Sequence, residues 1–560
     1  MLSVNRRRSD RWRVWAPVSC LVLALLLAGI AVSLTRRQAP LPVSSRVAVR
    51  AALQNPAARH ALAGSRGART RTVRLDARDD EVDFYIGGQI VAQVEVTVGG
   101  HVVAAADNRI ARVPYGDWIA YQPALLVVLC ALFVLMTAVT PWRRLRNFDV
   151  AACLSLVVGV VLFQHLYLAA SLLAALPGLA YLLLRCVLKA LGPAREPTAA
   201  TPLFTTLTPG LDPAHRIKWL RGLLFVLALV FVMVGVSSTE PLDVIYAAMA
   251  GATRLIHGVL PYGHMPAGIV HGDTYPILTY ALYAPVALVA PVNSLWDGVD
   301  AGLMVAVLAA LIAAWAVFRS IVGRRSGRPP ELEEAGLRAA LAWLAFPPLL
   351  ITASTGTTDV ALGAMLAIGV LLWRRPAACS AVLALAGWFK LAPFALLPLG
   401  LAPLRGRRLA GALAAVAAVS VPLLGLLVVL GGMRGPVDMV HAVSFQFGRD
   451  SLQSIWDALG IDRFQPLGEA GALGLVAVAV TRLWREPELA RDRTRMAALM
   501  AGILIAVQLA ASYWAFLYLA WVVPLVCFSL LADGLTVGET SWRTASARAG
   551  REPVPAPLAP

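Results

Sequence analysis

Charged residues are scarce in this chain. Only 14% of its 560 residues are Asp, Glu, Lys or Arg, whereas 59% are hydrophobic. A soluble protein carries about a quarter charged residues. Apolar runs of about 17 to 20 residues, each long enough to cross a bilayer, recur along the sequence. The composition therefore excludes an ordinary soluble enzyme and predicts an all-α polytopic integral membrane protein.

Cysteine is also scarce, and its placement argues against thiol chemistry. The six cysteines lie within or beside apolar runs, so the sequence predicts neither disulfides nor a thiolate metal site. We predict no tightly bound cofactor, and the sequence leaves open whether a divalent metal participates. No nucleic-acid-binding motif accompanies the net charge of +17, which is typical of Lys/Arg-rich cytoplasmic loops.

The N-terminal segment, residues 1–35, has a basic start and a long apolar run, and it resembles a signal peptide. The apolar run is longer than that of a typical signal peptide, and the segment lacks a convincing small-x-small cleavage site. The sequence therefore predicts a retained membrane anchor with its N-terminus in the cytoplasm.

The polar segment 36–122 is too long and too hydrophilic for a simple connector. It begins with a predicted helix, and Val94, Val96 and Val98 then alternate with polar residues, which is typical of a half-buried strand. Two Gly-Gly pairs supply turns. We predict an extracytoplasmic helix-plus-β-meander module that is similar in pattern to PepSY-type modules. A spacer role and a ligand-binding role both remain open.

The positive-inside rule orients the remainder of the chain. Apolar runs and composition predict additional spans in 123–190, a cytoplasmic linker at 191–219, a large membrane domain at 220–532 and a disordered cytoplasmic tail at 533–560. With every basic stop in the cytoplasm, about fourteen spans result and both termini lie inside the cell. The stretch 275–291 then cannot cross, so we predict a re-entrant or juxtamembrane segment on the outer side.

Asp243 is predicted to open a helix directly after an outward span. On a helical wheel, Asp243, Tyr246 and His257 fall on one polar side, and apolar residues fall on the other. This pattern predicts an interfacial helix with its apolar face toward the lipid. A carboxylate in the first turn is favoured by the helix dipole, so an end charge and a functional acid both remain open.

Other polar residues are predicted on the same outer face, and each has two interpretations. Asp359 follows two threonines, which together are typical of a helix start. Lys390 lies at a turn between apolar segments, where an ammonium snorkels or holds a phosphate. Arg449 either pairs with its neighbour Asp450 in a loop or binds a ligand.

The order of several short motifs resembles the GT-C superfamily of integral membrane glycosyltransferases. Within it, the chain is similar to glycosyltransferase family 87, the polyprenol-phosphate-mannose-dependent enzymes common in actinobacteria. The resemblance covers about residues 216–532, although Tyr275 is followed by Pro-Ile where many relatives have Pro-Pro. The motifs that carry it are DVIYAAMAGATRLIHGVLPYG, TYPILTYALYAP, KLAP, RDSLQS and SYWAFLYLAWVVP.

The resemblance implies a mannosyltransferase or a related hexosyl- or pentosyltransferase that uses a polyprenyl-phosphate sugar as donor. The acceptor would be an envelope lipid or glycan on the outer face of the plasma membrane. Asp243 would be the catalytic base, with Glu240 as a nearby alternative. The implied substrate-binding residues are Tyr246, His257, Tyr262, Tyr275, Asp359, Lys390, His441, Arg449 and Gln453.

Two other classes of function remain open. A transporter or flippase for a lipid-linked saccharide would favour ionisable groups at mid-membrane. The charges of this chain are predicted at span ends, and we find no internal repeat, which disfavours that class. A non-catalytic scaffold of envelope assembly would use the outer module to bind a partner.

Overall fold

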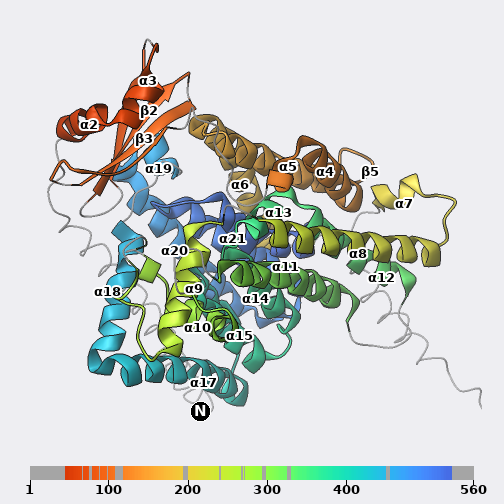
Figure 1. Cartoon of the computed structure of the whole chain (residues 1–560). Coiled ribbons are helices and arrows are strands. Elements are labelled where there is room, and N and C mark those ends of the chain that lie inside the picture. The colour runs from red at the N-terminus through yellow and green to blue at the C-terminus, as the bar shows by residue number, and fades with distance from the viewer. Residues whose placement is uncertain are drawn as a thin grey trace, which may run out of the picture.

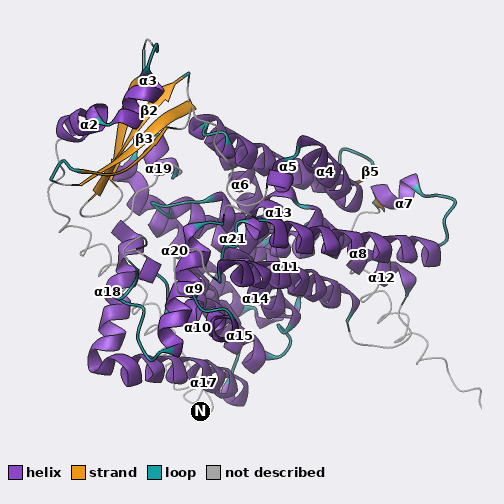
Figure 2. Cartoon of the chain, in the orientation of Figure 1, coloured by secondary structure: helices purple, strands orange, loops and turns teal. Residues whose placement is uncertain are grey.

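The computed structural model divides into a small α+β module and a larger, almost entirely helical body (Figures 1 and 2). The predicted anchor 1–35 and tail 533–560 lie outside the described residues. The structure describes residues 45–65, 67–74, 79–87, 89–97, 99–107, 118–192, 200–238, 241–266, 269, 272–292, 298–323, 329–448 and 454–532.

The module is the predicted helix-plus-meander unit. Its four strands form one antiparallel sheet in the order β1-β2-β3-β4. The single predicted helix is two helices, because Asn55 caps the second one by accepting the Ala57 N–H (2.9 Å) and Pro56 occupies its first turn. The elements are α2 (Ser45–Gln54), α3 (Pro56–Leu62), β1 (Arg69–Arg74), β2 (Asp79–Ile86), β3 (Gln89–Thr97) and β4 (Val102–Asp107).

The core of the module lies between the sheet and its two helices. Val94 and Val96 of β3 are buried against alanines of α2 and α3, so the predicted alternation is confirmed there, whereas Val98 lies outside the described residues. Gly87 and Gly100 both have positive φ (61° and 80°), as the predicted turns require.

The module docks on the turn between α5 (Leu145–Gln164) and α6 (Leu168–Leu191). The Ile90 N–H donates to the Leu166 carbonyl (3.3 Å), and the Gln89 side chain donates to the His165 carbonyl (3.1 Å). Ile90, Leu166 and Leu168 are buried together at this contact. The polar segment is therefore attached to the helical body by hydrogen bonds as well as by the chain.

Within the described residues, seven helical segments are long and apolar enough to cross a membrane, or eight if the bent pair α12 (Pro330–Ala345) and α13 (Pro347–Ser354) counts as one span. The expectation of about fourteen spans is not confirmed, because several predicted spans are shorter helices. The seven are α5, α6, α8 (Pro213–Ser237), α11 (Val299–Val322), Gly406–Gln446, Asp462–Arg485 and α21 (Arg493–Ala510).

The shorter apolar helices fill much of the remaining body. One of them is α10 (Ile277–Val289), which has 13 residues, a proline in its middle and a length of about 20 Å. A bilayer core is about 30 Å thick, so the expectation that 275–291 does not cross alone agrees with the length of α10. The others are α4 (Pro123–Thr137), α14 (Asp359–Leu371), α15 (Pro376–Phe389), Ala392–Leu401 and Phe516–Ser529.

Several labelled elements lie within the segments already given. The span Gly406–Gln446 contains α17 (Gly406–Gly431) and most of α18 (Gly435–Gly448), and Asp462–Arg485 contains α20 (Gln465–Arg485). The 3-10 helix η4 (Ala392–Leu396) begins Ala392–Leu401, and Phe516–Ser529 consists of η8 (Phe516–Tyr518) and α22 (Leu519–Ser529). The other elements include α9 (Asp243–Ile256), α19 (Ile455–Ala458), α7 (Leu203–Leu207), the paired β5 (Val139–Thr140) and β6 (Thr201–Pro202), and the 3-10 helix η2 (Trp118–Tyr121).

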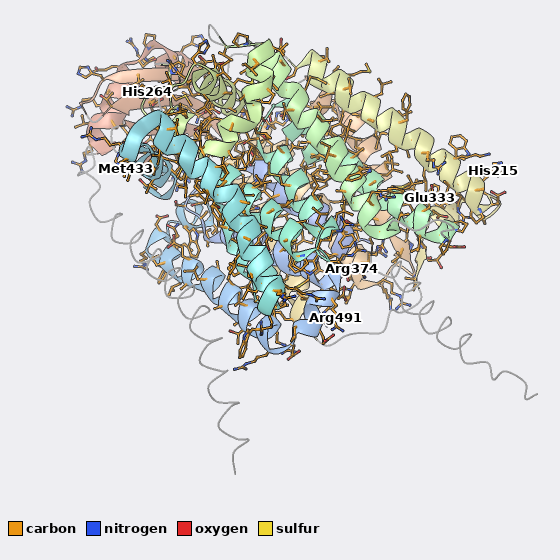
Figure 3. The ribbon with its side chains drawn as sticks, turned by 90° about the horizontal axis from the view of Figure 1, so that it is seen from below. His215, His264, Glu333, Arg374, Met433 and Arg491 are labelled. Carbon is orange, nitrogen blue, oxygen red and sulfur yellow. The ribbon has the colours of Figure 1, made fainter. Side chains whose placement is uncertain are left out.

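The helix ends gather on two opposite sides of the body. On one side, Arg216 pairs with Glu334 (3.0 Å), and the Arg405 guanidinium donates to the Trp484 carbonyl (3.0 Å). Figure 3 shows His215, Glu333, Arg374 and Arg491 on this side and His264 and Met433 on the other. We call the first side the basic end.

The opposite side carries the module and is called the module end. There the Ser238 hydroxyl donates to the Ser354 carbonyl (2.6 Å), which joins the end of α8 to the end of α13. The Gln446 side chain of α18 donates to the Thr274 hydroxyl (2.7 Å) in the loop before α10. Segments far apart in the sequence therefore meet at the module end.

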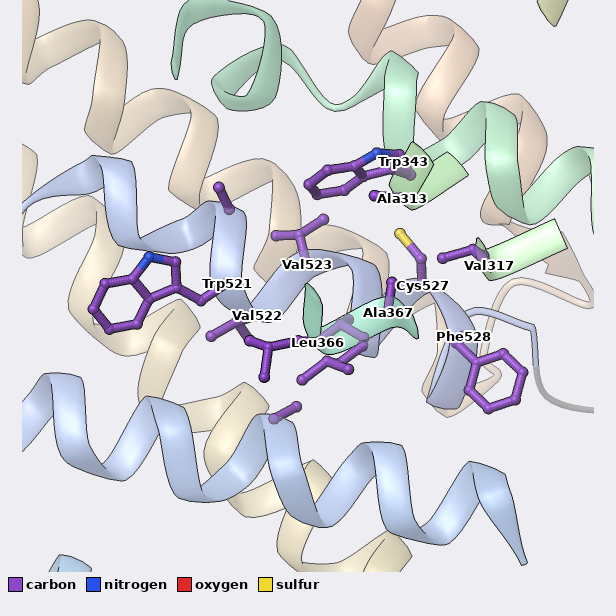
Figure 4. Close-up of a cluster of buried hydrophobic side chains, with 14 of the residues drawn as sticks. Ala313, Val317, Trp343, Leu366, Ala367, Trp521, Val522, Val523, Cys527 and Phe528 are labelled. Atoms are coloured by element: carbon purple, nitrogen blue, oxygen red, sulfur yellow. The ribbon is translucent and has the colours of Figure 1, made fainter. Parts of the chain in front are cut away.

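The centre of the body is a close-packed apolar core of α11, α12, α14, α21 and α22, part of which is shown in Figure 4. Gly363 decides the spacing of α14 and α22. A Cβ at that position would lie 2.2 Å from the Ala520 carbonyl oxygen, so only glycine permits this approach. The close approach brings the start of α22 beside the start of α14.

A buried carboxyl in the module makes its stability dependent on pH. Burial, and secondarily the charge of Glu81, raise the pKa of Asp83 to about 8. The folded module therefore retains a proton that the unfolded chain has already lost, and its free energy of unfolding falls as the pH rises from about 4 to about 8. To measure this fall, the full-length protein is heated at a series of pH values, and protease cleavage of the module is used to monitor its unfolding.

Two variants test the assignment to Asp83. Asp83→Asn removes the titrating group, so the free energy of unfolding of the module no longer falls as the pH rises. At pH 8 the variant module is therefore more stable than the wild-type module. Glu81→Gln lowers the pKa of Asp83 and makes the fall smaller without abolishing it. An unchanged pH dependence in Asp83→Asn would contradict the assignment.

Candidate functional site

A buried ion pair lies where α14 begins and α15 ends. The Lys390 ammonium nitrogen is 2.6 Å from Oδ1 of Asp359, and the indole N–H of Trp521 donates to the same oxygen at 2.7 Å. Asp359 is 1% exposed and Lys390 is 8% exposed. Lys390 therefore does not snorkel to water, because the carboxylate of a neighbouring helix draws its ammonium group into the body; its binding of a phosphate stays a prediction.

Three aromatic rings surround the ammonium group. The Lys390 nitrogen lies 5.4 Å from the ring centre of Tyr275, 5.6 Å from that of Tyr518 and 5.5 Å from that of Trp521. Tyr518 and Trp521 stack on each other with centroids 4.3 Å apart. These distances permit cation–π attraction in addition to the ion pair, so the loop before α10 and the segment Phe516–Ser529 are held around one charge.

Local backbone structure explains the position of each partner. Asp359 is the first residue of α14. Its carboxylate makes no capping hydrogen bond to the backbone of that helix, and it is therefore available to Lys390. Lys390 is the residue at which α15 ends, and the Thr279 hydroxyl of α10 donates to the preceding carbonyl of Phe389. The expected helix start at Asp359 is confirmed, and the side chain has a further role as half of the ion pair.

Buried hydroxyl groups without a partner lie close to the pair in sequence or in space. Among the described residues, the hydroxyls of Tyr283, Thr357 and Thr358 are buried and make no hydrogen bond. Tyr283 of α10 is near enough to Asp359 to interact with its charge. A buried hydroxyl without a partner is unfavourable, and these groups can donate to or accept from a hydroxylated ligand or water.

Asp243 lies beside the loop of residues 355–358, which contains Thr357 and Thr358, and its side chain is on the solvent side of that loop. It is the first residue of α9 and is exposed, as the sequence predicts. The preceding Leu242 N–H donates to the Thr355 carbonyl (3.0 Å), which fixes the start of α9 against the loop that ends at Asp359. Within the described part of the chain, the Asp243 carboxylate makes no hydrogen bond or ion pair, so it is available to a ligand.

The predicted interfacial orientation of α9 is wrong. The helix is buried on every side from Ile245 to Ala252, and Tyr246 is only 4% exposed. Small residues cause this close packing, since a Cβ at Gly251 would lie 2.2 Å from the Tyr280 ring of α10. The run of alanine and glycine in the sequence was the signal for a packed helix.

The predicted tyrosines have unequal access to a ligand. Tyr262 is buried, and its hydroxyl donates to the Tyr275 carbonyl (3.1 Å). Burial raises the pKa of Tyr262 well above its usual range, so it remains a donor at neutral pH. Tyr262 therefore supports Tyr275, which is half-buried and faces Lys390.

The other predicted binding residues are not brought to the ion pair. His257 is exposed at the end of α9, where its Nδ1 is 2.7 Å from the Thr253 carbonyl oxygen. His441 is exposed on α18. Arg449, Gln453 and Glu240 lie outside the described residues.

Sequence reasoning missed Trp521, Tyr518 and Tyr283. The aromatic motif SYWAFLYLAWVVP contains two of them, and its density of aromatic residues was the available signal. Among the residues that the structure describes, no group of three His, Cys, Asp or Glu side chains is arranged to hold a metal ion.

Comparisons with known proteins gave no assignment: no family model matches the sequence, and the search of curated proteins found no match.

The ion pair predicts a specific pattern of stability. Lys390→Met or Asp359→Asn leaves one group buried without its partner, so each lowers the free energy of unfolding by about 3–5 kcal/mol. The double variant removes both charges and recovers part of that loss. Trp521→Phe keeps the ring but loses a hydrogen bond to a charged group, which costs about 1.5–3 kcal/mol.

Thermal unfolding of the purified variants in detergent measures the pattern, with Arg408→Met at the exposed start of α17 as the control. A loss in the double variant equal to the sum of the two single losses would contradict a direct pairing of the two side chains.

Proposed function

We propose that this chain is a membrane glycosyltransferase that transfers a sugar from a polyprenyl-phosphate donor to an envelope lipid or glycan acceptor. The observation that carries the proposal is the exposed Asp243 carboxylate beside a buried polar site. That site contains Asp359, Lys390 and three aromatic rings from two segments, the loop before α10 and Phe516–Ser529. The resemblance of the sequence motifs to the GT-C superfamily and to glycosyltransferase family 87 points in the same direction.

In the proposed reaction, Asp243 accepts the proton of the acceptor hydroxyl. The acceptor oxygen forms a bond to the anomeric carbon of the sugar, and the bond from that carbon to the phosphate oxygen breaks. The electron pair of that bond leaves with the polyprenyl phosphate. Asp243 then releases its proton to water, so charge and atoms balance.

Lys390 has a smaller role in this proposal than the sequence implied. An ammonium has three N–H donors, and Asp359 accepts one of them. The remaining donors can reach a phosphate oxygen, but the positive charge is balanced by Asp359. Lys390 and Asp359 would therefore order Tyr275, Tyr518 and Trp521 as a wall for the sugar, and phosphate binding would depend more strongly on Arg449.

The proposed orientation places the basic end in the cytoplasm and the module end outside the cell. Its support is the concentration of arginines at one end of the helices, which the positive-inside rule assigns to the cytoplasm. In this orientation Asp243 faces the outer leaflet of the plasma membrane, where a lipid-linked donor would reach it. Both chain termini would then lie inside.

One observation favours a second candidate function, a transporter or flippase for a lipid-linked saccharide. The Asp359–Lys390 pair is buried in the helical body, and α12 and α13 meet at a 56° bend. Buried charges next to interrupted helices occur at transport sites. A transporter moves the lipid-linked sugar intact, whereas the proposed enzyme cleaves it, so product analysis separates the two functions.

Asp243→Asn tests the proposed base. The amide keeps the shape of the side chain and removes its basicity, so turnover of a polyprenyl-phosphate sugar falls by about 10²- to 10⁴-fold. Thermal stability stays near the wild-type value, because the carboxylate makes no contact that the substitution removes. The measurement is sugar transfer by purified protein in liposomes.

Asp300→Asn is the matched control, since Asp300 is also exposed in the first turn of a helix, α11. It should retain wild-type turnover. Normal transfer by Asp243→Asn would overturn its role as base, and release of intact donor on the opposite side of the liposome would favour the transporter.

Orientation is tested with two single cysteines in a variant that lacks the six native ones. A cysteine at His264 should react with an impermeant thiol reagent added outside intact cells. A cysteine at His215, on the opposite side in Figure 3, should react only after permeabilisation. The reverse pattern would contradict the proposed orientation.

A further inference from the structure

Three apolar side chains are exposed on α18 and directly before it, at the module end. Val437 and Val440 of α18 are 64% and 62% exposed, and Met433 in the preceding 3-10 helix η5 (Gly432–Arg434) is 82% exposed. Residues three positions apart in a helix project from the same side, so Val437 and Val440 form one surface. We call these three side chains the α18 stripe.

The stripe lies beyond the end of a helix that is long enough to cross the membrane by itself. With 26 residues, α17 is about 39 Å long, whereas the hydrocarbon core of a bilayer is about 30 Å thick. Gly432 has a φ of 60°, outside the range of a right-handed helix, so the helical direction changes there. Figure 1 shows α18 running across the end of α17. The membrane boundary at the module end therefore falls close to α18.

The other two sides of α18 have different surroundings. Its inner side, which includes Met439 and Ala442, packs in an apolar cluster with Leu427 of α17. A third side carries Asp438 and His441, which are exposed and each follow a residue of the stripe by one position. Successive residues of a helix point about 100° apart. The helix therefore has one side against protein, one exposed apolar side and one exposed polar side.

Lipid is the partner that matches this arrangement. An apolar side next to a polar side is typical of a helix that lies in the plane of the membrane interface. The stripe follows directly on the exposed apolar face of α17, whose residue Val429 is 81% exposed and precedes Met433 by four positions. Because α17 is long enough to cross the bilayer, that face contacts lipid, and the stripe continues the contact to the membrane surface.

We propose that α18 lies in the membrane surface at the module end, with the α18 stripe inserted among the acyl chains directly below the lipid headgroups. Asp438 and His441 then face the headgroups and water. This role of α18 does not depend on the proposed glycosyltransferase activity, because it follows from exposure, length and the direction of the helix.

The contact has a consequence for the candidate site. A helix that lies in the surface keeps one depth along its length, so both ends of α18 are at the level of the headgroups. Near its second end, the Gln446 side chain donates to the Thr274 hydroxyl (2.7 Å), and the next residue, Tyr275, faces Lys390. The site is therefore at headgroup level, where it suits an amphiphilic ligand whose polar part lies among the headgroups.

The test uses a polarity-sensitive fluorophore on a single cysteine of the full-length protein in liposomes. The two variants are Val440→Cys on the stripe and Asp438→Cys on the polar side, each without the six native cysteines. The fluorophore at Val440→Cys emits at shorter wavelength, and a nitroxide on the acyl chain close to the headgroup quenches it several-fold more than aqueous iodide does. The fluorophore at Asp438→Cys shows the opposite preference.

Both positions are exposed, so both variants keep the unfolding temperature of the cysteine-free parent. Equal quenching by iodide at the two positions would show that the stripe faces water. Protection of Val440→Cys from both quenchers would show that protein, such as a second copy of the chain, covers the stripe. Stronger quenching by a nitroxide near the end of the acyl chain would place α18 inside the hydrocarbon. Each of these three results overturns the proposal.

Discussion

The ion pair between Asp359 and Lys390 is the contact on which the arrangement of the module end depends. It joins the start of α14 to the end of α15, and the indole N–H of Trp521 adds the start of α22. A buried charge that loses its partner is strongly unfavourable, so these three helix ends cannot separate independently. The loop before Asp359 in turn holds the start of α9 and with it Asp243.

Local patterns in the sequence predicted the local structure well. The alternation at Val94 and Val96, the start of α9 at Asp243 and the short α10 all follow from periodicity, end signals and length. The ion pair could not be predicted, because Asp359 and Lys390 are 31 positions apart and each by itself resembles a group at a helix end. Their pairing depends on how α14 packs beside α15, which no single segment specifies.

The number of spans shows the same limit. Each apolar run was treated as a crossing, but polar and proline residues divide several runs into helices shorter than a bilayer is thick, as at Pro347, where α13 begins directly after α12. Such helices depend on their neighbours to shield their ends. The amphipathic pattern of α9 was likewise overridden, because buried alanines occupy part of the face that a helical wheel marks as polar and Gly251 allows close contact with α10.

The two acids of the candidate site differ in their access to water. Asp243 is exposed and Asp359 is 1% exposed. Dissolved ions screen exposed charges over about 8 Å at physiological salt but reach buried pairs much less. Salt concentration therefore acts on the two carboxylates unequally: it screens the charge of Asp243 and leaves the contact that holds the helices together almost unaffected.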